Sequence, residues 1–342
     1  MPVSKKSEIP LVKAAFRKQF TVAMEAMGIE SKNYYRKVRL PVSEPEDLES
    51  LVPLRPMYRL ANVVAMEEGI PDFGSGVARL TPWHKVESLE SLINNSKTLG
   101  ELIRIFCEKA VNQRSNADFR LCNEDAISWF GYHGPVILKN DVQLELYRIT
   151  SMIQLVQLAA GSGWRPQRVE LRMPEIDIST ACSFIKQSEL KFSSDVSRFS
   201  IPNILLKLPV SLIIPVTLKN SNSDYNIHGD FLETLRQIIP AFFDRGPCKI
   251  ESIADVTELS VRTLQRRIRK HGTNFNQLLG EARFSLAKNY LADPTSTTAG
   301  IAAQLGYTDS AHFIRAFRRW SGMAPGEFRR NSADSEIVST QK

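Results

Sequence analysis

The last third of this 342-residue chain contains an internal repeat, and this repeat limits the possible fold more than any other feature of the sequence. Each copy has an Ile-Ala pair, a short turn, and then a stretch with apolar and basic residues at helical spacing. The copies run from Ile253 to Ile268 and from Ile301 to Phe317, with one extra residue in the second turn. A short helix, a tight turn and a longer basic helix form a helix-turn-helix unit, so the sequence predicts two such units.

In the first copy, the second helix is predicted to cover residues 260–270. Ser260 is placed to cap this helix with its hydroxyl group. Val261, Leu264 and Ile268 fall on one face and should pack against Ile253 and Ala254. The opposite face carries the candidate DNA-binding residues Arg262, Gln265, Arg266 and Arg269. Arg and Gln suit the major groove because Arg pairs with guanine and Gln with adenine through two hydrogen bonds.

In the second copy, the corresponding helix is predicted over residues 309–320, with Phe313, Phe317 and Trp320 as its buried stripe. Base contacts usually come from the first part of such a helix. The candidates for base contacts are Ser310, Ala311, His312 and Arg315. Arg318 and Arg319 lie further along and are predicted to contact phosphates.

A predicted helix over residues 275–291 joins the two units, and its seventeen residues span about 26 Å. With the widths of the flanking helices added, the two DNA-contacting helices lie roughly 34 Å apart, which is one turn of DNA. One monomer is therefore expected to bind two successive major grooves on one face of the duplex.

The repeat also resembles the AraC/XylS family of bacterial transcription regulators, over about residues 230–330. The resemblance is carried by Leu259–Arg267, Ile301–Trp320, Gly322, Pro325 and Phe328-Arg329. It implies that Arg262, Gln265 and Arg266 lie on the family's first recognition helix, and Ser310, Ala311, His312 and Arg315 on the second. Two positions depart from the family pattern.

Glu258 stands where the family often has Gly, and a non-Gly residue there costs about 1 kcal/mol if φ is positive. Ala324 stands in place of the usual Ser before Pro325, which removes a helix cap. Both departures concern local stability and not the DNA-contacting faces.

The first part of the chain is similar to the subset of this family whose first domain is named arabinose-binding-like. The resemblance is carried by Pro71–Gly74, Gly163–Pro166, Val169–Leu171 and Phe192–Leu208. The family name does not imply a sugar ligand.

The polar residues 220–229 are predicted to link an N-terminal sensor and dimerisation domain (1–219) to a DNA-binding domain (230–330), with a disordered tail at 331–342. The fold class is an α+β domain followed by an all-α domain in which a long helix joins the helix-turn-helix units. Predicted helices of the first domain cover residues 11–27, 99–111 and 141–160, and predicted strands cover 118–121, 126–132, 168–172 and 198–201. The second domain is predicted to have helices at 231–243, 251–256, 260–270, 275–291, 298–305 and 309–320, and a last one starting at Pro325.

The charge of the chain is concentrated in its last third. Residues 230–330 hold 15 Lys and Arg against 10 Asp and Glu, which gives +5 of the total net charge of +7. A basic excess at this place is typical of a partner that is a polyanion, here double-stranded DNA.

No apolar run reaches the length of a membrane span, and the first ten residues lack the apolar core of a signal peptide, so the cytoplasm is the expected location. The four cysteines contain no CxxC pair, the histidines show no metal spacing, and the cysteines are expected to be buried free thiols. Gly74-Ser75-Gly76 lacks the third glycine of a dinucleotide-binding loop. No cofactor, metal or catalytic residue is therefore predicted.

The favoured hypothesis is a ligand-responsive transcription activator that forms a homodimer through its N-terminal domain, with RNA polymerase as a plausible partner and an effector of unknown identity. One alternative is a regulator controlled by a protein partner or by its own abundance. A second alternative, from another class, is a sensor or enzyme domain that the helical part holds on DNA. A dry, filled N-terminal core would favour a protein partner, and convergent polar groups would favour a ligand.

Overall fold

The computed structural model describes residues 9–42, 48–83, 93–110, 117–134, 141–177, 182–210, 230–245 and 248–331. The chain divides into two compact units. The N-terminal unit comprises residues 1–38 and 46–228, and the C-terminal unit comprises residues 39–45 and 229–342. The predicted linker, 220–229, and the predicted tail beyond Asn331 lie outside the described residues.

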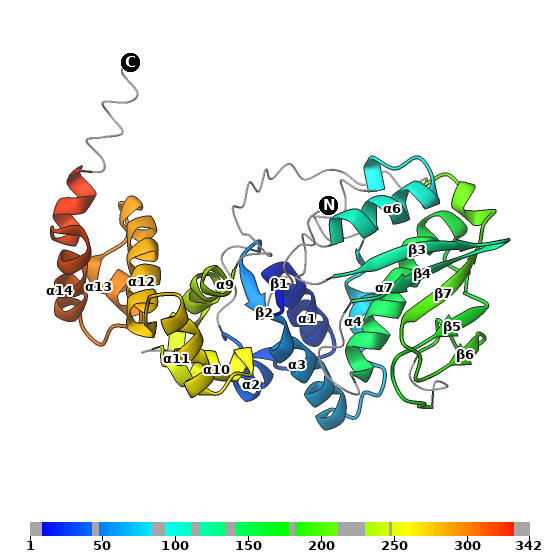
Figure 1. Ribbon diagram of the computed structural model, residues 1–342, viewed down its shortest axis with the longest axis horizontal. Coiled ribbons are helices and arrows are strands. Elements are labelled where there is room, and N and C mark those ends of the chain that lie inside the picture. The colour runs from blue at the N-terminus through cyan, green and yellow to red at the C-terminus, as the bar shows by residue number, and fades with distance from the viewer. Residues whose placement is uncertain are drawn as a thin grey trace, which may run out of the picture. The chain divides into compact units, whose positions relative to one another are not determined.

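The N-terminal unit combines helices with two sheets (Figure 1). Its helices are α1 (Ala14–Ala26), α2 (Ser31–Lys37), α3 (Leu54–Glu67), α4 (Phe73–Leu80), α6 (Leu99–Lys109) and α7 (Val142–Ala160). Its strands are β1 (Leu11–Lys13), β2 (Leu51–Pro53), β3 (Phe119–Glu124), β4 (Ile127–Tyr132), β5 (Arg168–Glu170), β6 (Glu189–Lys191) and β7 (Ser197–Pro202). β1 and β2 form a two-stranded sheet, and the larger sheet has the order β3-β4-β7-β5-β6. Neighbouring strands of the larger sheet are antiparallel except β5 and β6.

The core of this unit lies where α6 and α7 cover one face of the larger sheet (Figure 1). The buried side chains that meet there include Leu102, Phe106, Ile149, Ile153, Phe130 and Phe199. Apolar residues of α6 recur at helical spacing, which is why this helix buries one face, and it is capped by Thr98, whose hydroxyl accepts from the Glu101 N–H.

The segment Gly74-Ser75-Gly76 lies within α4, where it allows a close crossing with α7. A Cβ atom added at Gly74 would lie 1.8 Å from the main-chain oxygen of Gln143. The Gly74 N–H donates to the Gln143 side chain at 2.9 Å, and the hydroxyls of Ser75 and Thr150 lie 3.0 Å apart. These glycines therefore serve helix packing.

A charged pair, Glu145 and Arg148, is buried on α7. The Arg148 guanidinium lies 4.2 Å from the ring centre of Tyr132 and donates to the Tyr58 hydroxyl at 3.1 Å. Burial is the largest effect on Arg148 and lowers its pKa, but the combined attraction of Glu145, of Tyr58 and Tyr132 and of Asp141 raises the pKa above its usual value. Glu145 Oε1 is buried and has no hydrogen-bond partner within the described part of the chain.

The larger helices and strands predicted for this unit are confirmed, but three predictions need correction. Residues 11–13 were expected to be helical and instead form β1, because Leu11 pairs with Pro53 in a strand contact that local periodicity does not reveal. Strands β2 and β6 and helices α2, α3 and α4 were not predicted. The thiols are not all buried, since Cys122 on β3 is exposed and Cys107 is half-buried.

From Asp230 to Asn331, the described residues of the C-terminal unit form helices joined by turns, with no strand. It contains α9 (Phe231–Ile238), a 3₁₀ helix (Ile239–Arg245), α10 (Ile250–Thr257), α11 (Val261–Lys270), α12 (Phe275–Ala292), α13 (Thr298–Gln304) and α14 (Ser310–Ser321). Residues 325–331 are also helical and begin at Pro325, as predicted. The single helix predicted over 231–243 changes to a 3₁₀ helix after Ile238, since Pro240 lacks the N–H that an α-helix requires. α12 lies between the pair α10–α11 and the pair α13–α14 (Figure 1).

Candidate nucleic-acid interface

The two predicted helix-turn-helix units have the same backbone turn. α10 ends before Glu258, which has the left-handed values φ 54° and ψ 31°. Gly306, with φ 72°, stands at the same place in the second unit. In each turn, the residue after this left-handed position donates its N–H to the carbonyl oxygen of the alanine in the Ile-Ala pair. The distances are 3.0 Å from Leu259 N to Ala254 O and 2.9 Å from Tyr307 N to Ala302 O. The repeat in the sequence is therefore also a repeat in backbone geometry.

The first recognition helix, α11, is held from one side. Ser260 caps it, accepting from the Thr263 N–H at 3.2 Å. Leu264 and Ile268 are fully buried, and α11 packs against α10, while Val261 is half-buried. The candidate DNA-binding residues are exposed: Arg262, Gln265, Arg266 and Arg269. This face carries no acidic side chain over the length of α11, so its charge is wholly positive.

The second recognition helix, α14, is capped by Asp309, whose carboxylate accepts from the His312 N–H at 2.7 Å. Phe313 and Phe317 are fully buried. The exposed residues include Ala311, His312, Arg315, Arg318 and Arg319, whereas Ser310 is half-buried. When the two capping residues are aligned, Arg315 takes the place that Arg266 has in α11. The structure thus places these two arginines at equivalent positions of the two helices.

His312 and Asp309 form a contact at the start of α14. The Nδ1 atom of His312 lies 2.8 Å from Oδ2 of Asp309. The amide hydrogen bond from His312 is the main reason why the pKa of Asp309 lies below its usual value, and the helix N-terminus favours the same charged form. The contact keeps the imidazole beside the first turn of the helix.

Trp320 differs from its predicted role in the buried stripe, because it is only half-buried. Its ring lies against α12, 5.9 Å from the ring of Phe284 and close to Gly280, where an added Cβ would lie 3.3 Å from Trp320 Nε1. This contact with a helix distant in sequence is not visible from helical periodicity alone. It makes Trp320 part of the junction between α14 and α12.

α12 separates the two helix-turn-helix units. Its 18 residues correspond to a length of about 27 Å. The helix starts with a complete capping box in which Asn274 and Gln277 exchange hydrogen bonds. On the side of the first unit, Arg236 of α9 binds Glu281 with an Nε–Oε2 distance of 3.0 Å.

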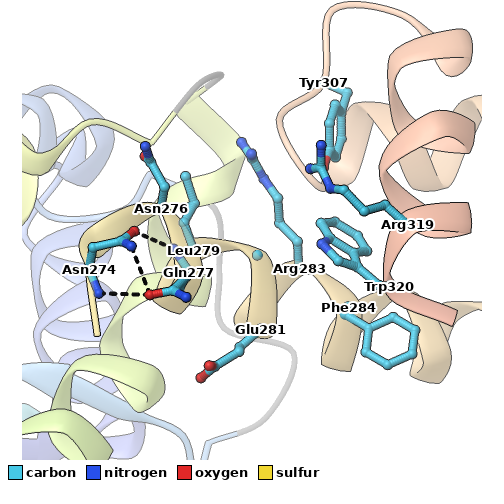
Figure 2. Close-up of a pocket in the computed structure, with 11 residues that line it drawn as sticks. Asn274, Asn276, Gln277, Leu279, Glu281, Arg283, Phe284, Tyr307, Arg319 and Trp320 are labelled. Carbon is cyan, nitrogen blue, oxygen red and sulfur yellow. Dashed lines mark hydrogen bonds between the residues drawn. The ribbon is translucent and has the colours of Figure 1, made fainter. Parts of the chain in front are cut away.

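A cleft of about 850 Å³ opens between α12 and α14, and we call it the α12 cleft (Figure 2). The residues that line it are Asn274, Asn276, Gln277, Leu279, Gly280, Glu281, Arg283, Phe284, Tyr307, Arg319 and Trp320. Arg319, a predicted phosphate contact, extends into it from α14 beside Tyr307. Burial raises the pKa of Tyr307, and Arg283 and Arg319 partly oppose this effect. Both arginines therefore place positive charge near the ring.

Arg283 is a residue that the sequence did not single out, since the helix over 275–291 was assigned only a spacing role. Its Nε donates to the Leu305 carbonyl oxygen at 3.1 Å, and its guanidinium lies 4.6 Å from the ring centre of Tyr307 and 5.4 Å from that of Phe243. It joins α12 to the turn of the second unit. The one available signal was an arginine next to the buried Ala282, too common a pattern to be informative.

Two helix-turn-helix units with exposed arginines on their second helices define a DNA-binding transcription regulator. Comparison with known families agrees: residues 253–331 match the helix-turn-helix domain, and residues 28–210 match the arabinose-binding domain of AraC transcription regulators, N-terminal. The second match covers more than half of the chain. The chain belongs to the AraC family of transcription regulators.

Individual relatives are regulators as well. The chain is 23% identical over 334 residues to the HTH-type transcriptional regulator VirS of Mycobacterium tuberculosis, covering 93% of this chain and 96% of VirS. It is 30% identical over 137 residues to the ornithine utilization regulator of Pseudomonas aeruginosa, which is 38% of this chain and 40% of that protein. The solved structure of the transcriptional regulator CdpR from Pseudomonas aeruginosa aligns with 92% of this chain and 98% of CdpR at 15% identity and a TM-score of 0.43.

The family and these relatives are transcription regulators and not enzymes. None of the described helices is both long and apolar enough to cross a lipid bilayer.

Proposed function

We propose that one monomer binds two successive major grooves, with α11 in one groove and α14 in the next. The observation that carries the proposal is the equivalence of Arg266 and Arg315, both exposed and both within two turns of a capped helix start. At such positions an Arg side chain reaches base edges, and a bidentate contact with guanine discriminates by about 1–3 kcal/mol. Each helix then specifies one half of the binding site.

The remaining predicted residues divide by their place on the two helices. Arg262 and Gln265 on α11, and Ser310, Ala311 and His312 on α14, lie near the helix starts and are proposed to contact bases. Arg269, Arg318 and Arg319 lie near the helix ends, where the sugar-phosphate wall of the groove is closest, and Arg318 and Arg319 are proposed to contact phosphates. Phosphate contacts fix the position of the protein on DNA and carry no sequence information.

The test is a binding-site selection with Arg266→Ala, Arg315→Ala and Arg319→Ala at one fixed salt concentration. The first two should relax the preference at one or two base pairs, each in a different half of the site. Arg319→Ala should weaken binding to all sequences about equally and lower the salt slope by about one.

Arg236→Ala is the matched control, because Arg236 is a half-buried arginine of the same unit that is bound to Glu281 and lies outside both recognition helices. It should leave the base preferences unchanged. The assignment of the recognition faces is wrong if all variants keep the wild-type base preferences and lose only affinity.

We further propose that residues 230–330 act as the DNA-binding domain, that the N-terminal domain makes the protein a homodimer, and that the protein activates transcription in the cytoplasm by contact with RNA polymerase. The dimer is supported by the resemblance to the family. Sedimentation of the full chain at micromolar concentration, with and without DNA, tests the dimer. A monomer under both conditions would contradict it.

We also propose that a small molecule controls the protein. The support is the buried group formed by Glu145 and Arg148 of α7 with Tyr58 and Tyr132. A buried carboxylate oxygen without a hydrogen-bond partner is costly, and a donor from a bound molecule would satisfy it. The fitting chemistry is a primary amine or a guanidine. Control by a protein partner or by abundance is the alternative.

Thermal melting of the full chain with a panel of small amines and guanidines tests the proposal for an effector. At least one compound should raise the melting temperature of the wild type and leave that of Glu145→Gln unchanged. A panel without any such compound favours the alternative.

A further inference from the structure

β3 is the edge strand of the larger sheet, and within the described residues it pairs with β4 alone (Figure 1). Its side chains at Arg120, Cys122, Asn123 and Glu124 are exposed. A six-residue edge strand presents backbone N–H and C=O groups to which another strand can pair.

The backbone direction of β3 follows from one hydrogen bond at its start. The His133 N–H donates to the Asp118 carbonyl oxygen at 2.7 Å, which continues the β3–β4 ladder by one pair. Because an antiparallel strand alternates the direction of its backbone groups, Arg120, Cys122 and Glu124 also direct theirs toward β4. Leu121 and Asn123 therefore direct their N–H and C=O groups toward the open edge.

The charges of β3 are arranged symmetrically about Cys122. Arg120 lies two residues before it and Glu124 two residues after it, so all three lie on the same face of the sheet. If two copies of β3 pair antiparallel with Cys122 opposite Cys122, each Arg120 stands opposite the Glu124 of the other copy. Leu121 and Asn123 then form the hydrogen-bonded pairs, giving about four backbone hydrogen bonds across the two-fold axis.

Of the registers centred on Leu121, Cys122 and Asn123, only the one at Cys122 places opposite charges face to face. If the axis moves to Leu121, Glu124 stands opposite Asp118 of the second copy, and like charges directly opposite are unfavourable. If it moves to Asn123, the charged side chains find no opposite charge. Charges on an edge strand usually oppose pairing, but here their signs and their equal spacing from Cys122 favour pairing of the strand with itself.

We propose that β3 is the surface through which two copies of this chain pair, antiparallel and with Cys122 on the two-fold axis, so that the two larger sheets become one. The inference rests on the homodimer proposed above and names its surface. Two six-residue edges cover less than the roughly 800 Å² per partner of a standard stable interface, so we expect dissociation in the micromolar range.

Charge reversal in the full chain tests the register. Arg120→Glu alone and Glu124→Arg alone each place like charges opposite one another twice, so each should weaken the dimer by about tenfold or more in sedimentation velocity. An equimolar mixture of the two variants should form a heterodimer about as strong as the wild-type dimer, because opposite charges again face each other.

The mixture separates an interface effect from an effect within one chain. Arg120 also binds Asp118, and Glu124 accepts from the Trp129 indole, so either change perturbs its own strand. Such damage is not repaired by mixing, and a mixture that stays as weak as the single variants overturns the proposal. Arg168→Glu, an exposed charge on β5 away from the edge, is the control and should leave the dimer unchanged.

Oxidation with diamide gives an independent measurement. Residues opposite each other in a non-hydrogen-bonded pair have Cα atoms about 4.5 Å apart, which a disulfide can join. The full chain should become a Cys122–Cys122 linked dimer that is absent in Cys122→Ser. Burial raises the pKa of Cys107 to about 12 and that of Cys248 to about 11, so these thiols react slowly near neutral pH.

The outcomes for the surface and for the dimer itself differ. A wild-type dimer that withstands both charge reversals and does not cross-link at Cys122 overturns the surface and leaves the homodimer standing. A wild-type monomer at all micromolar concentrations overturns both.

Discussion

Replacing Glu258 by glycine should stabilise the first helix-turn-helix unit. Glu258 has φ 54° and ψ 31°, and its counterpart in the second unit, with the same hydrogen bond after it, is Gly306 at φ 72°. A side chain with a Cβ atom is strained in this left-handed conformation, and glycine is not. At this left-handed position, the first turn thus has an unfavourable residue and the second has a favourable one.

The size of the effect follows from two opposing contributions. The left-handed conformation costs a non-glycine residue about 1–2 kcal/mol. Glycine loses more backbone freedom on folding, which returns about 0.5–1 kcal/mol of that gain. The net stabilisation by Glu258→Gly is therefore about 0.5–1 kcal/mol. Because Glu258 is exposed and has further interactions of its own, Glu258→Ala serves as the reference that removes them and keeps the Cβ atom.

Hydrogen exchange of the full chain measures the stabilisation of the first helix-turn-helix unit by Glu258→Gly. Amides of the buried residues Leu264 and Ile268 in α11 should exchange about two- to fivefold more slowly in Glu258→Gly than in Glu258→Ala. Gly306→Ala should have the opposite effect on α13 and α14. The strain argument is refuted if Glu258→Gly exchanges no more slowly than Glu258→Ala.

Other outcomes are expected at three further places. The segment 230–330 alone should bind DNA more weakly than the full chain, and its affinity, measured by fluorescence anisotropy, should fall steeply between low and moderate salt; a folded segment without this dependence would contradict the domain assignment. Gly74→Ala should destabilise the chain in urea by about 2–3 kcal/mol or more, because its Cβ would overlap the Gln143 main chain, whereas Gly163→Ala, with open space around it, should have little effect. The carboxylate of Asp309 has a lowered pKa in the folded protein, so its contribution is present above the unfolded value of about 3.8 and is lost as the pH falls through the folded value. The melting temperature of the wild type should therefore exceed that of Asp309→Asn at neutral pH and approach it toward pH 3, and a constant difference would show that the charge has no role.

The C-terminal unit could be predicted from sequence because its determining interactions are local. Ser260 caps the helix that begins next to it, and Leu264 and Ile268 are buried because they share a face one turn apart. The recognition faces are what remains after that burial. Even the strained turn at Glu258 could be anticipated, through the glycine that the family often has at this position.

What could not be predicted depends on contacts between segments distant in the chain. Leu11 continues the helical pattern of the following residues, yet it pairs with Pro53. The sequence excluded Gly74-Ser75-Gly76 as a dinucleotide-binding loop, but the packing role of Gly74 depends on its contact with Gln143, which is distant in the chain. Trp320 has the spacing of a core residue, but its partner is α12, and its burial is decided there. The role of Arg283 likewise depends on Leu305.

Helix α12, which connects the two helix-turn-helix units, also has a consequence for the DNA site. α12 is continuous over 18 residues, and Arg283 joins it to the turn before α14. In the proposed complex, this connection sets the distance and the rotation about the DNA axis between the two recognition helices. One inserted base pair between the two contacted segments moves the second by about 3.4 Å and rotates it by about 35°. In the proposed complex, a single insertion in the middle of a monomer's site should therefore remove the same contacts as the loss of one half of that site, even though every contacted base is still present.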